Sequence, residues 1–225
     1  MAQDQPGTVI GGRCTLTRLL GAGGLGQVWQ AHDPVLGVDV AIKQVRLDRA
    51  LPDGTRTELV ARAASEARNA ARLRDDPHIV TVYAVEVDEG PRRVPWIVMQ
   101  WVDGRSLVEE LKHDGPLNLE RAVQVSKALL RALETAHRAD VVHRDVKPAN
   151  VLLAANGSIP LADFGIAVAG RDPNSPALPS SSAHPPAWHP NAGGNPTATA
   201  GSDLFSLGVT LYKAPTGDSW NRQLQ

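Results

Sequence analysis

The chain has 225 residues, 42% of them hydrophobic, and a formal net charge of −1. This length allows one large domain or two small lobes, and the charge gives no general attraction for nucleic acid or an anionic membrane surface. No run of about 18 apolar residues predicts a transmembrane segment. The single Cys14 excludes an intramolecular disulfide, and the first eight residues lack the apolar core of a signal peptide. We therefore expect a cytoplasmic protein.

A glycine-rich turn follows the first predicted strand, residues 14–20, with Gly21, Gly23 and Gly26 as its regularly spaced glycines. Such a turn lets backbone N–H groups approach phosphate oxygens without obstruction by Cβ atoms. The same spacing matches the dinucleotide-binding fingerprint, which requires a helix directly after the last glycine. The residues that follow are strand-like instead. The sequence thus favours a phosphate-binding hairpin, with a merely flexible hairpin as the alternative.

A lysine and a glutamate stand at positions where both are expected to face a core. Lys43 lies in the predicted strand Val38–Val45, and Glu66 lies on the apolar stripe of the predicted helix Glu58–Arg74. Because an acid in an apolar stripe needs a buried partner, Lys43 is the candidate for Glu66. The alternative is that each side chain reaches solvent at the edge of its element.

Two strands and two helices are predicted next. Ile79–Val87 and Val94–Val102 are the strands, and the second is so apolar that we expect it to be buried on both faces. Leu107–Lys112 is a short helix, and a longer helix runs to about Arg138 from Asn118, a good N-cap residue. The face of the longer helix that we expect to be buried comprises Leu119, Val123, Leu130, Leu133 and His137.

The loop His143–Asn150 concentrates chemically active side chains between two apolar segments. It places Asp145, Lys147 and Asn150 within six residues, and Pro148 argues against a buried helix or strand. A polar loop held between apolar elements is a common way for a scaffold to present reactive groups.

A hairpin is predicted directly after this loop. Asn156-Gly157 is a tight-turn sequence between Val151–Ala154 and Ile159–Ala162, and Asp163 follows the second arm. The hairpin should bring Asn150 next to Asp163. Both offer hard oxygen ligands of the kind that Mg²⁺ prefers, so we expect them to share a metal site.

The composition changes after this point. Residues 171–200 are rich in Pro, Ser, Ala, Gly and Asn, which predicts a mobile loop. A helical pattern resumes at Gly201–Leu211 and includes Asp203.

Taken in order, the glycine turn, strand lysine, helix acid, His-Arg-Asp loop and Asp-Phe-Gly motif resemble those of bacterial-type (eukaryotic-like) serine/threonine protein kinases. The resemblance covers residues 12–168 and 201–212. It implies an α+β, two-lobed kinase-like fold, with a small antiparallel sheet and a helix in the first lobe and an incomplete, mainly helical second lobe. The implied parts are a tail (1–11), the first lobe (12–102), the second lobe (103–213) with a divergent activation loop (170–200), and a second tail (214–225).

The resemblance also implies catalytic roles. Asp145 would accept the proton of the substrate hydroxyl, and Lys147 would steady the transferred phosphate and mark a serine/threonine-directed member. Lys43, paired with Glu66, would hold the nucleotide phosphates. The implied cofactors are ATP and Mg²⁺, with Asn150 and Asp163 as the metal ligands.

The nucleotide-binding residues follow from the same resemblance. Met99 would be the gatekeeper, Gln100, Trp101 and Val102 the hinge, and Asp203 the anchor of the catalytic loop. The full set expected to contact ATP is Gly21, Ala22, Gly23, Gly24, Gly26, Val28, Ala41, Lys43, Met99, Gln100, Val102 and Leu152. The expected partners are ATP and a protein substrate with Ser or Thr, with self-association for autophosphorylation and no nucleic acid or membrane segment.

Two departures from the family pattern keep alternatives open. No Ala-Pro-Glu triplet closes the activation loop, and the later helices of the large lobe do not follow Asp203. A nucleotide-binding pseudokinase or interaction module, or an inactive truncated fragment, would also fit this pattern.

Overall fold

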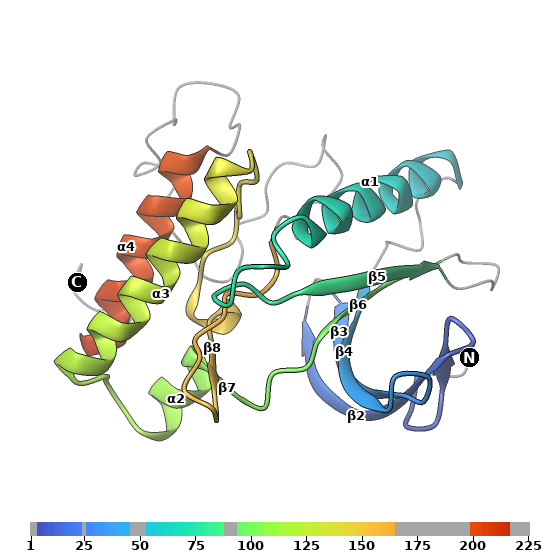
Figure 1. The fold of residues 1–225 in the computed structure, drawn as a ribbon, viewed down its shortest axis with the longest axis horizontal. Coiled ribbons are helices and arrows are strands. Elements are labelled where there is room, and N and C mark those ends of the chain that lie inside the picture. Colours follow the sequence, from blue (N-terminus) through green and yellow to red (C-terminus); the bar gives the residue numbers. More distant parts are fainter. Residues whose placement is uncertain (1–3, 24–25, 46–52, 88–93, 165–198, 217–225) are drawn as a thin grey trace, which may run out of the picture. The chain divides into compact units, whose positions relative to one another are not determined.

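The computed structural model describes residues 4–23, 26–45, 53–87, 94–164 and 199–216 (Figure 1). These residues form two compact units. The first contains the described residues up to Asp75 together with Val80–Asp103, and the second contains Asp76–Ile79 and the described residues from Gly104 onward. No helix in the described part of the chain is both long and apolar enough to cross a bilayer.

The first unit is built on an antiparallel sheet with the strand order β1-β2-β3-β4-β6-β5. This arrangement confirms the small antiparallel sheet that the sequence predicts for the first lobe. The strands are β1 (Val9–Ile10), β2 (Cys14–Gly23), β3 (Gly26–Asp33), β4 (Val38–Val45), β5 (Val82–Val87) and β6 (Pro95–Gln100).

The glycine-rich stretch joins two strands. Strand β2 continues to Gly23, which pairs across the turn with Gly26, the first residue of β3. Gly26 has φ 129°, a backbone angle that favours glycine. Since a strand rather than a helix follows the last glycine, the dinucleotide alternative is excluded.

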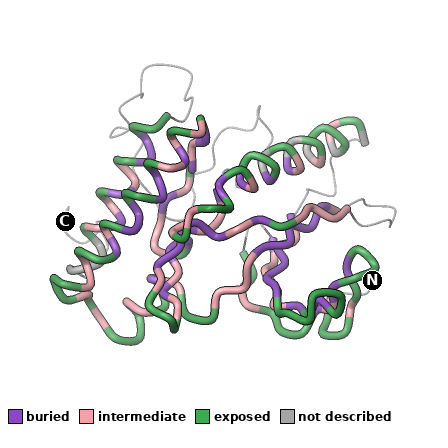
Figure 2. Tube along the Cα trace, viewed as in Figure 1, coloured by how far each residue is buried: buried purple, intermediate pink, exposed green. Residues whose placement is uncertain are grey.

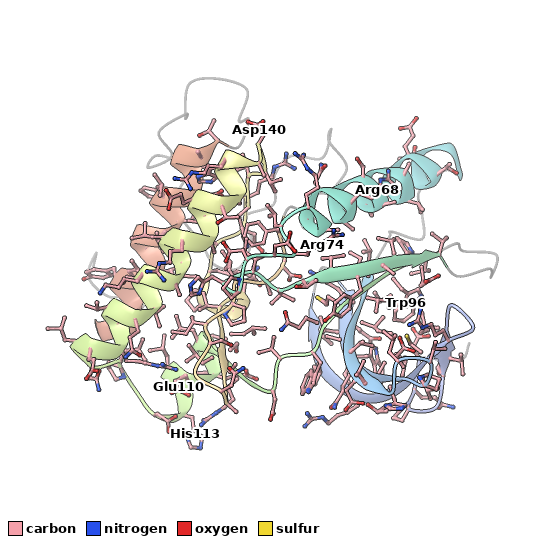
Figure 3. All side chains as sticks on the ribbon, viewed as in Figure 1. Arg68, Arg74, Trp96, Glu110, His113 and Asp140 are labelled. Atoms are coloured by element: carbon pink, nitrogen blue, oxygen red, sulfur yellow. The ribbon has the colours of Figure 1, made fainter. Side chains whose placement is uncertain are left out.

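The two faces of this sheet differ in what they carry. One face packs an apolar core that includes Trp29, Val40, Ile42 and Trp96, of which Trp96 is labelled in Figure 3. Because side chains alternate along a strand, Lys43 projects from the opposite face of β4.

Helix α1 (Asp53–Ala71) packs against β5 and β6. Its buried residues include Ala63, Ala67 and Ala70, which lie along one stripe of the helix. The helix begins five residues before the predicted Glu58 and ends three before Arg74, where a turn takes over. Strand β6 is buried along nearly its whole length, as expected from its apolar sequence (Figure 2).

The second unit is mainly helical. Its elements are the strand β7 (Gly104–Ser106), the helices α2 (Leu107–His113) and α3 (Leu119–Arg138), the 3-10 helix η1 (Pro148–Asn150), the strand β8 (Leu152–Ala154) and the helix α4 (Ala200–Thr216). Asn118 caps α3 as predicted, because its side chain accepts a hydrogen bond from the backbone N–H of Arg121 at 2.8 Å.

The predicted buried face of α3 is wrong in part. Leu119, Val123 and Leu130 are exposed, while Leu133 is buried. The helix packs against α4, and three of its six buried residues are alanines. The prediction relied on the largest apolar residues of α3 and therefore placed its buried stripe part of a turn away from the observed one. The buried residues are Val125, Ala128, Leu129, Ala132, Leu133 and Ala136.

The predicted hairpin after the loop His143–Asn150 is confirmed by its backbone hydrogen bonds. The N–H of Leu152 donates to Pro160 O, and the N–H of Ala154 donates to Ser158 O, each at 3.0 Å. Gly157 turns the chain with φ 87°. The sequence did not predict that β8 also pairs with β7, whose Gly104 lies so close that an added Cβ would stand 2.1 Å from the carbonyl oxygen of Leu153.

Candidate active site

Three predicted site residues meet in the loop His143–Asn150. Lys147 Nζ lies 2.6 Å from Asp145 Oδ2. The side-chain amide of Asn150 donates to the carbonyl oxygen of Asp145 at 2.8 Å and lies 3.3 Å from its Oδ2. The structure therefore brings an ammonium, a carboxylate and a carboxamide together within one short loop.

Asp203 of α4 holds the start of this loop. Its Oδ2 accepts from the backbone N–H of His143 and its Oδ1 from that of Arg144, each at 2.8 Å. Arg144 has φ 71°, a left-handed conformation that costs energy in a residue with a side chain. The buried carboxylate stabilises that conformation, so the expected anchoring by Asp203 is confirmed.

His143 links the loop His143–Asn150 to the segment that carries Asp163. Its Nε2 lies 2.9 Å from the carbonyl oxygen of Ala162, and its Nδ1 accepts from the backbone N–H of Asp145 at 3.2 Å. The ring also meets Phe164 edge to face, with 4.5 Å between ring centroids. Burial lowers the pKa of His143, although the bond to Ala162 acts in the opposite direction. The ring is therefore neutral, with its proton on Nε2.

Asn150 and Asp163 lie at adjoining ends of the two hairpin arms. The backbone N–H of Ala162 donates to Asn150 O at 2.8 Å, which places the residue before Asp163 directly against Asn150. Asp163 has φ 67°, a second strained backbone position in this region.

The chemistry of these two side chains fits Mg²⁺. Because Nδ2 of Asn150 donates to Asp145, Oδ1 is the amide atom left to act as an oxygen ligand. In the described part of the chain, no three His, Cys, Asp or Glu side chains gather into a metal cage. One carboxylate and one amide suit a Mg²⁺ ion that takes its other ligands from phosphates and water.

In the first unit, several predicted nucleotide-binding residues share one face of the sheet. Lys43 pairs with Val28 of β3, and Ala41 pairs with Met99 of β6. Directly paired residues project from the same face, and Lys43 is only 5% exposed there. Gly21 pairs with Val28 and so adjoins the same surface.

The remaining predicted contacts lie on neighbouring backbone. Ala22 and Gly23 end β2, and the N–H of Gln100 donates to Thr81 O at 2.8 Å at the start of the predicted hinge. Val102 follows β6 and is half-buried, and Leu152 lies in β8 of the second unit.

Some predictions lie outside the described residues. Gly24 is one of them, and so is the side chain of Glu66, although its backbone belongs to α1. The ion pair between Lys43 and Glu66 stays a prediction. The segment 171–198, most of the expected activation loop, also lies outside the described residues.

Two polar contacts near these residues were not predicted. His137 Nε2 lies 2.8 Å from Asp203 Oδ2, so α3 also contributes to the anchor. The guanidinium carbon of Arg18 lies 6.0 Å from the ring centroid of Trp101. His137 lies six residues before the loop His143–Asn150 and Arg18 lies three residues before Gly21, and neither belongs to a sequence motif. Their partners are therefore apparent only from the fold.

Comparison with known proteins supplies an independent line of evidence. The sequence matches the protein kinase domain family over residues 14–223. It is 40% identical over 210 residues to a probable serine/threonine-protein kinase of Streptomyces coelicolor, covering 92% of this chain and 30% of that protein. It is 34% identical over 211 residues to the serine/threonine-protein kinase PrkC of Bacillus subtilis, covering 94% of this chain and 31% of that protein.

The structure agrees with that comparison. The kinase domain of a cysteine-to-alanine mutant of Mycobacterium tuberculosis PknI superposes with a TM-score of 0.72 at 28% identity, covering all of this chain and 82% of the other. The chain thus spans about a third of the length of the curated relatives named above and most of a solved kinase domain.

Proposed function

We propose that this chain, which belongs to the protein kinase family, transfers the γ-phosphoryl group of ATP to serine and threonine hydroxyls of proteins. The observation that carries the proposal is the loop in which Asp145 contacts both Lys147 and Asn150 while Asp203 fixes its backbone. Phosphoryl transfer needs positioned phosphates and an aligned hydroxyl more than covalent chemistry from the protein, and this loop supplies positioned groups.

In the proposed reaction Asp145 orients the substrate hydroxyl and accepts its proton. Lys147 lies 2.6 Å from that carboxylate and would neutralise charge on the transferred phosphoryl group. A lysine at this place in the loop supports serine and threonine as the acceptors, in keeping with the names of the relatives.

The other predicted residues would hold the nucleotide. Lys43, oriented by Glu66, would bind the phosphates beneath the glycine turn, and the hinge Gln100–Val102 would bind adenine through its backbone. Asn150 and Asp163 would hold Mg²⁺, which when bound neutralises charge on the phosphate oxygens. Gly21, Ala22, Gly23, Gly24, Gly26, Val28, Ala41, Met99 and Leu152 would line this site.

The partners proposed here are ATP and a protein that presents a serine or threonine. A second copy of the chain could serve as that protein during autophosphorylation. The complete set of lysine, aspartates and asparagine supports a catalyst over a pseudokinase that only binds nucleotide.

The test is phosphate incorporation measured by mass spectrometry after incubation with Mg-ATP. The wild type should phosphorylate itself or a generic protein substrate, and Asp145→Asn should lose at least about a hundredfold in rate. Asp140→Asn makes the same chemical change at an exposed residue of the second unit and should keep wild-type activity (Figure 3). Equal incorporation by the wild type and Asp145→Asn would contradict the catalytic assignment.

A further inference from the structure

Trp101, in the proposed hinge, lies within cation–π range of Arg18, which belongs to the strand that leads into the glycine turn. The guanidinium carbon of Arg18, in β2, is 6.0 Å from the centroid of the Trp101 ring. A guanidinium at about this distance from an indole face is attracted by the ring quadrupole. The contact joins the hinge to the strand that ends in Gly21–Gly23.

Arg18 is itself held by a chain of side-chain hydrogen bonds. Its Nε donates to Gln30 Oε1 at 3.3 Å, and Gln30 Nε2 donates to Asp39 Oδ2 at 2.9 Å. Asp39 Oδ1 lies 3.0 Å from His32 Nδ1. We call these five residues, Trp101, Arg18, Gln30, Asp39 and His32, the rim network.

The four members of the rim network that belong to strands, Arg18, Gln30, His32 and Asp39, lie on the face of the sheet that carries Lys43. Gln30 pairs directly with Ala41, and His32 pairs with Asp39. Because paired residues share a face and alternate residues repeat it, Asp39, Ala41 and Lys43 follow one another along the same side of β4. The network therefore continues the proposed nucleotide surface beyond Ala41, at the end away from Lys43.

We propose that the rim network is a positioning device for the adenine end of ATP. Arg18 and Trp101 tie the strand before the glycine turn to the hinge, and Gln30 and Asp39 keep Arg18 from leaving the ring for solvent. The network thereby fixes the hinge backbone against the base without touching the phosphates. This inference rests on the proposed function and adds to it the residues that set nucleotide affinity at this end of the site.

The test is a double-mutant cycle on nucleotide affinity. The dissociation constant of a non-hydrolysable ATP analogue with Mg²⁺ is measured by calorimetry for wild type, Arg18→Gln, Trp101→Leu and the double variant. Each single change should weaken binding about two- to fivefold, and the double variant should be no weaker than the worse single one. Trp101→Phe keeps an aromatic ring and should recover part of the affinity. Arg138→Gln, an exposed arginine on α3, is the matched control and should leave binding unchanged.

Steady-state kinetics separates positioning from general damage. The KM for ATP should rise with the dissociation constant while kcat stays within about twofold, because the groups that hold the phosphates are unaltered. Two results would overturn this inference and leave the proposed function standing. One is a double variant in which the two single effects on affinity multiply, and the other is wild-type affinity in both Arg18→Gln and Trp101→Leu. A wild type that binds no ATP analogue would overturn both the inference and the proposed function.

Discussion

At the scale of single residues, the site depends on a histidine that must stay neutral. His143 accepts the N–H of Asp145 at Nδ1 and contacts Ala162 O through Nε2. A second proton on the ring would remove the acceptor for Asp145 and place a charge in a buried position. The protonation state of His143 thus decides whether the backbone N–H of Asp145, the proposed catalytic aspartate, keeps its hydrogen-bond acceptor.

The lowered pKa of His143 predicts a pH dependence of stability. The unfolded chain binds this proton below about pH 6.5, while the folded chain resists it to lower pH, so stability falls as pH decreases through that window. We expect a lower Tm at pH 5.5 than at pH 7.5, with a loss of at most about 1.4 kcal/mol per pH unit from this group.

His143→Asn supplies the control for this prediction, since its amide oxygen can replace Nδ1 as an acceptor without titrating. The difference in Tm between the two pH values should shrink in the variant. Two carboxylates with shifted pKa values do not contribute to this pH difference. The pKa values of Asp33 and Asp39 are lowered by Arg13 and His32 respectively, so these carboxylates lose their contribution to stability only below about pH 4. An unchanged pH difference in His143→Asn would remove His143 as its cause.

At the scale of elements, α4 matters because it carries Asp203 to the catalytic loop. Each carboxylate oxygen of Asp203 accepts a separate backbone N–H, and His137 of α3 contacts Oδ2 as well. An asparagine at this position would place an NH2 donor, in place of one of the oxygens, against one of these two N–H donors. The helix therefore determines the conformation of a loop that lies about 60 residues earlier in the chain.

Asp203→Asn should accordingly damage both stability and catalysis. The unsatisfied backbone N–H should cost about 1–3 kcal/mol of unfolding free energy, and kcat should fall at least about tenfold because Arg144 and Asp145 lose their fixed positions. Denaturant unfolding and steady-state kinetics measure the two effects. Asp75→Asn, at an exposed residue of the first unit, should change neither, and equal losses in both variants would refute the specific role of Asp203.

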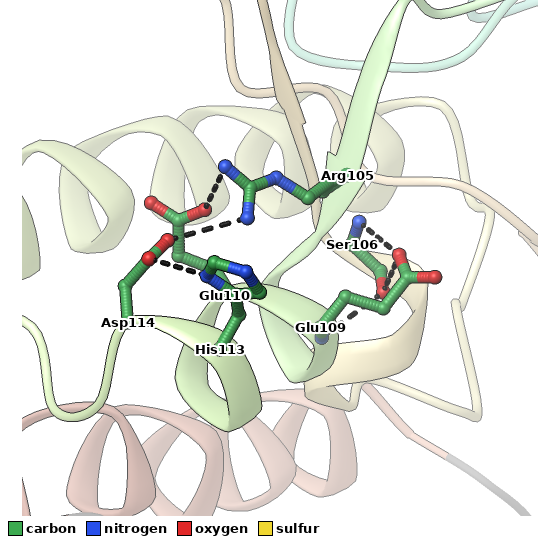
Figure 4. Close-up of polar contacts among 6 residues, drawn as sticks. All are labelled: Arg105, Ser106, Glu109, Glu110, His113 and Asp114. Carbon is green, nitrogen blue, oxygen red and sulfur yellow. Dashed lines mark hydrogen bonds and ion pairs between the residues drawn. The ribbon is translucent and has the colours of Figure 1, made fainter.

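Helix α2 offers a separate test of local structure. Ser106 accepts from the backbone N–H of Glu109, and the Glu109 carboxylate accepts from the backbone N–H of Ser106 at 2.8 Å (Figure 4). This capping box begins the helix whose first N–H, that of Leu107, donates to Val151 O directly after the catalytic loop.

Ser106→Ala should therefore lower the free energy of unfolding by about 0.5–2 kcal/mol. Ser126→Ala is the matched control, because Ser126 bonds only to the preceding turn of α3 within the described residues. Thermal or denaturant unfolding distinguishes the two. A cost at Ser126 as large as that at Ser106 would show that the effect is not due to the cap.

The elements also show how far the sequence could predict this protein. The glycine turn, the N-cap Asn118 and the turn at Gly157 were predictable because local backbone chemistry decides them. The buried face of α3 was not, because three of its six buried residues are alanines, whose hydrophobic signal is weaker than that of the exposed leucines and valine of the same helix. The contact between Arg18 and Trp101 depends on strand register, which no local pattern specifies.

At the scale of the whole molecule, the residues proposed to bind the nucleotide belong to two different compact units. Lys43 and Met99 belong to the first unit, and Asn150 and Asp163 belong to the second. A ligand that binds the folded protein and not the unfolded chain stabilises the folded protein by mass action.

Mg-ATP should therefore raise the Tm. At about 100-fold excess over its dissociation constant, the ligand should add about 2.7 kcal/mol to the free energy of unfolding. Lys43→Met should show a smaller shift at the same ligand concentration, and Lys112→Met, at an exposed lysine of α2, should match the wild type. Differential scanning fluorimetry checks this, and identical shifts in all three proteins would exclude Lys43 from the nucleotide site.

The bond from Asp203 back to His143 also has a consequence for the order of folding during synthesis. Its two backbone contacts span 60 and 59 residues, so they cannot form until the ribosome has released α4. The strands of the first unit, although β4 and β6 pair over a similar stretch of chain, are all synthesised by Gln100. Because domains form as the chain emerges, we expect the proposed catalytic loop to become rigid only after the sheet has folded. A nascent chain would thus complete its proposed phosphate-binding turn well before it could catalyse phosphoryl transfer.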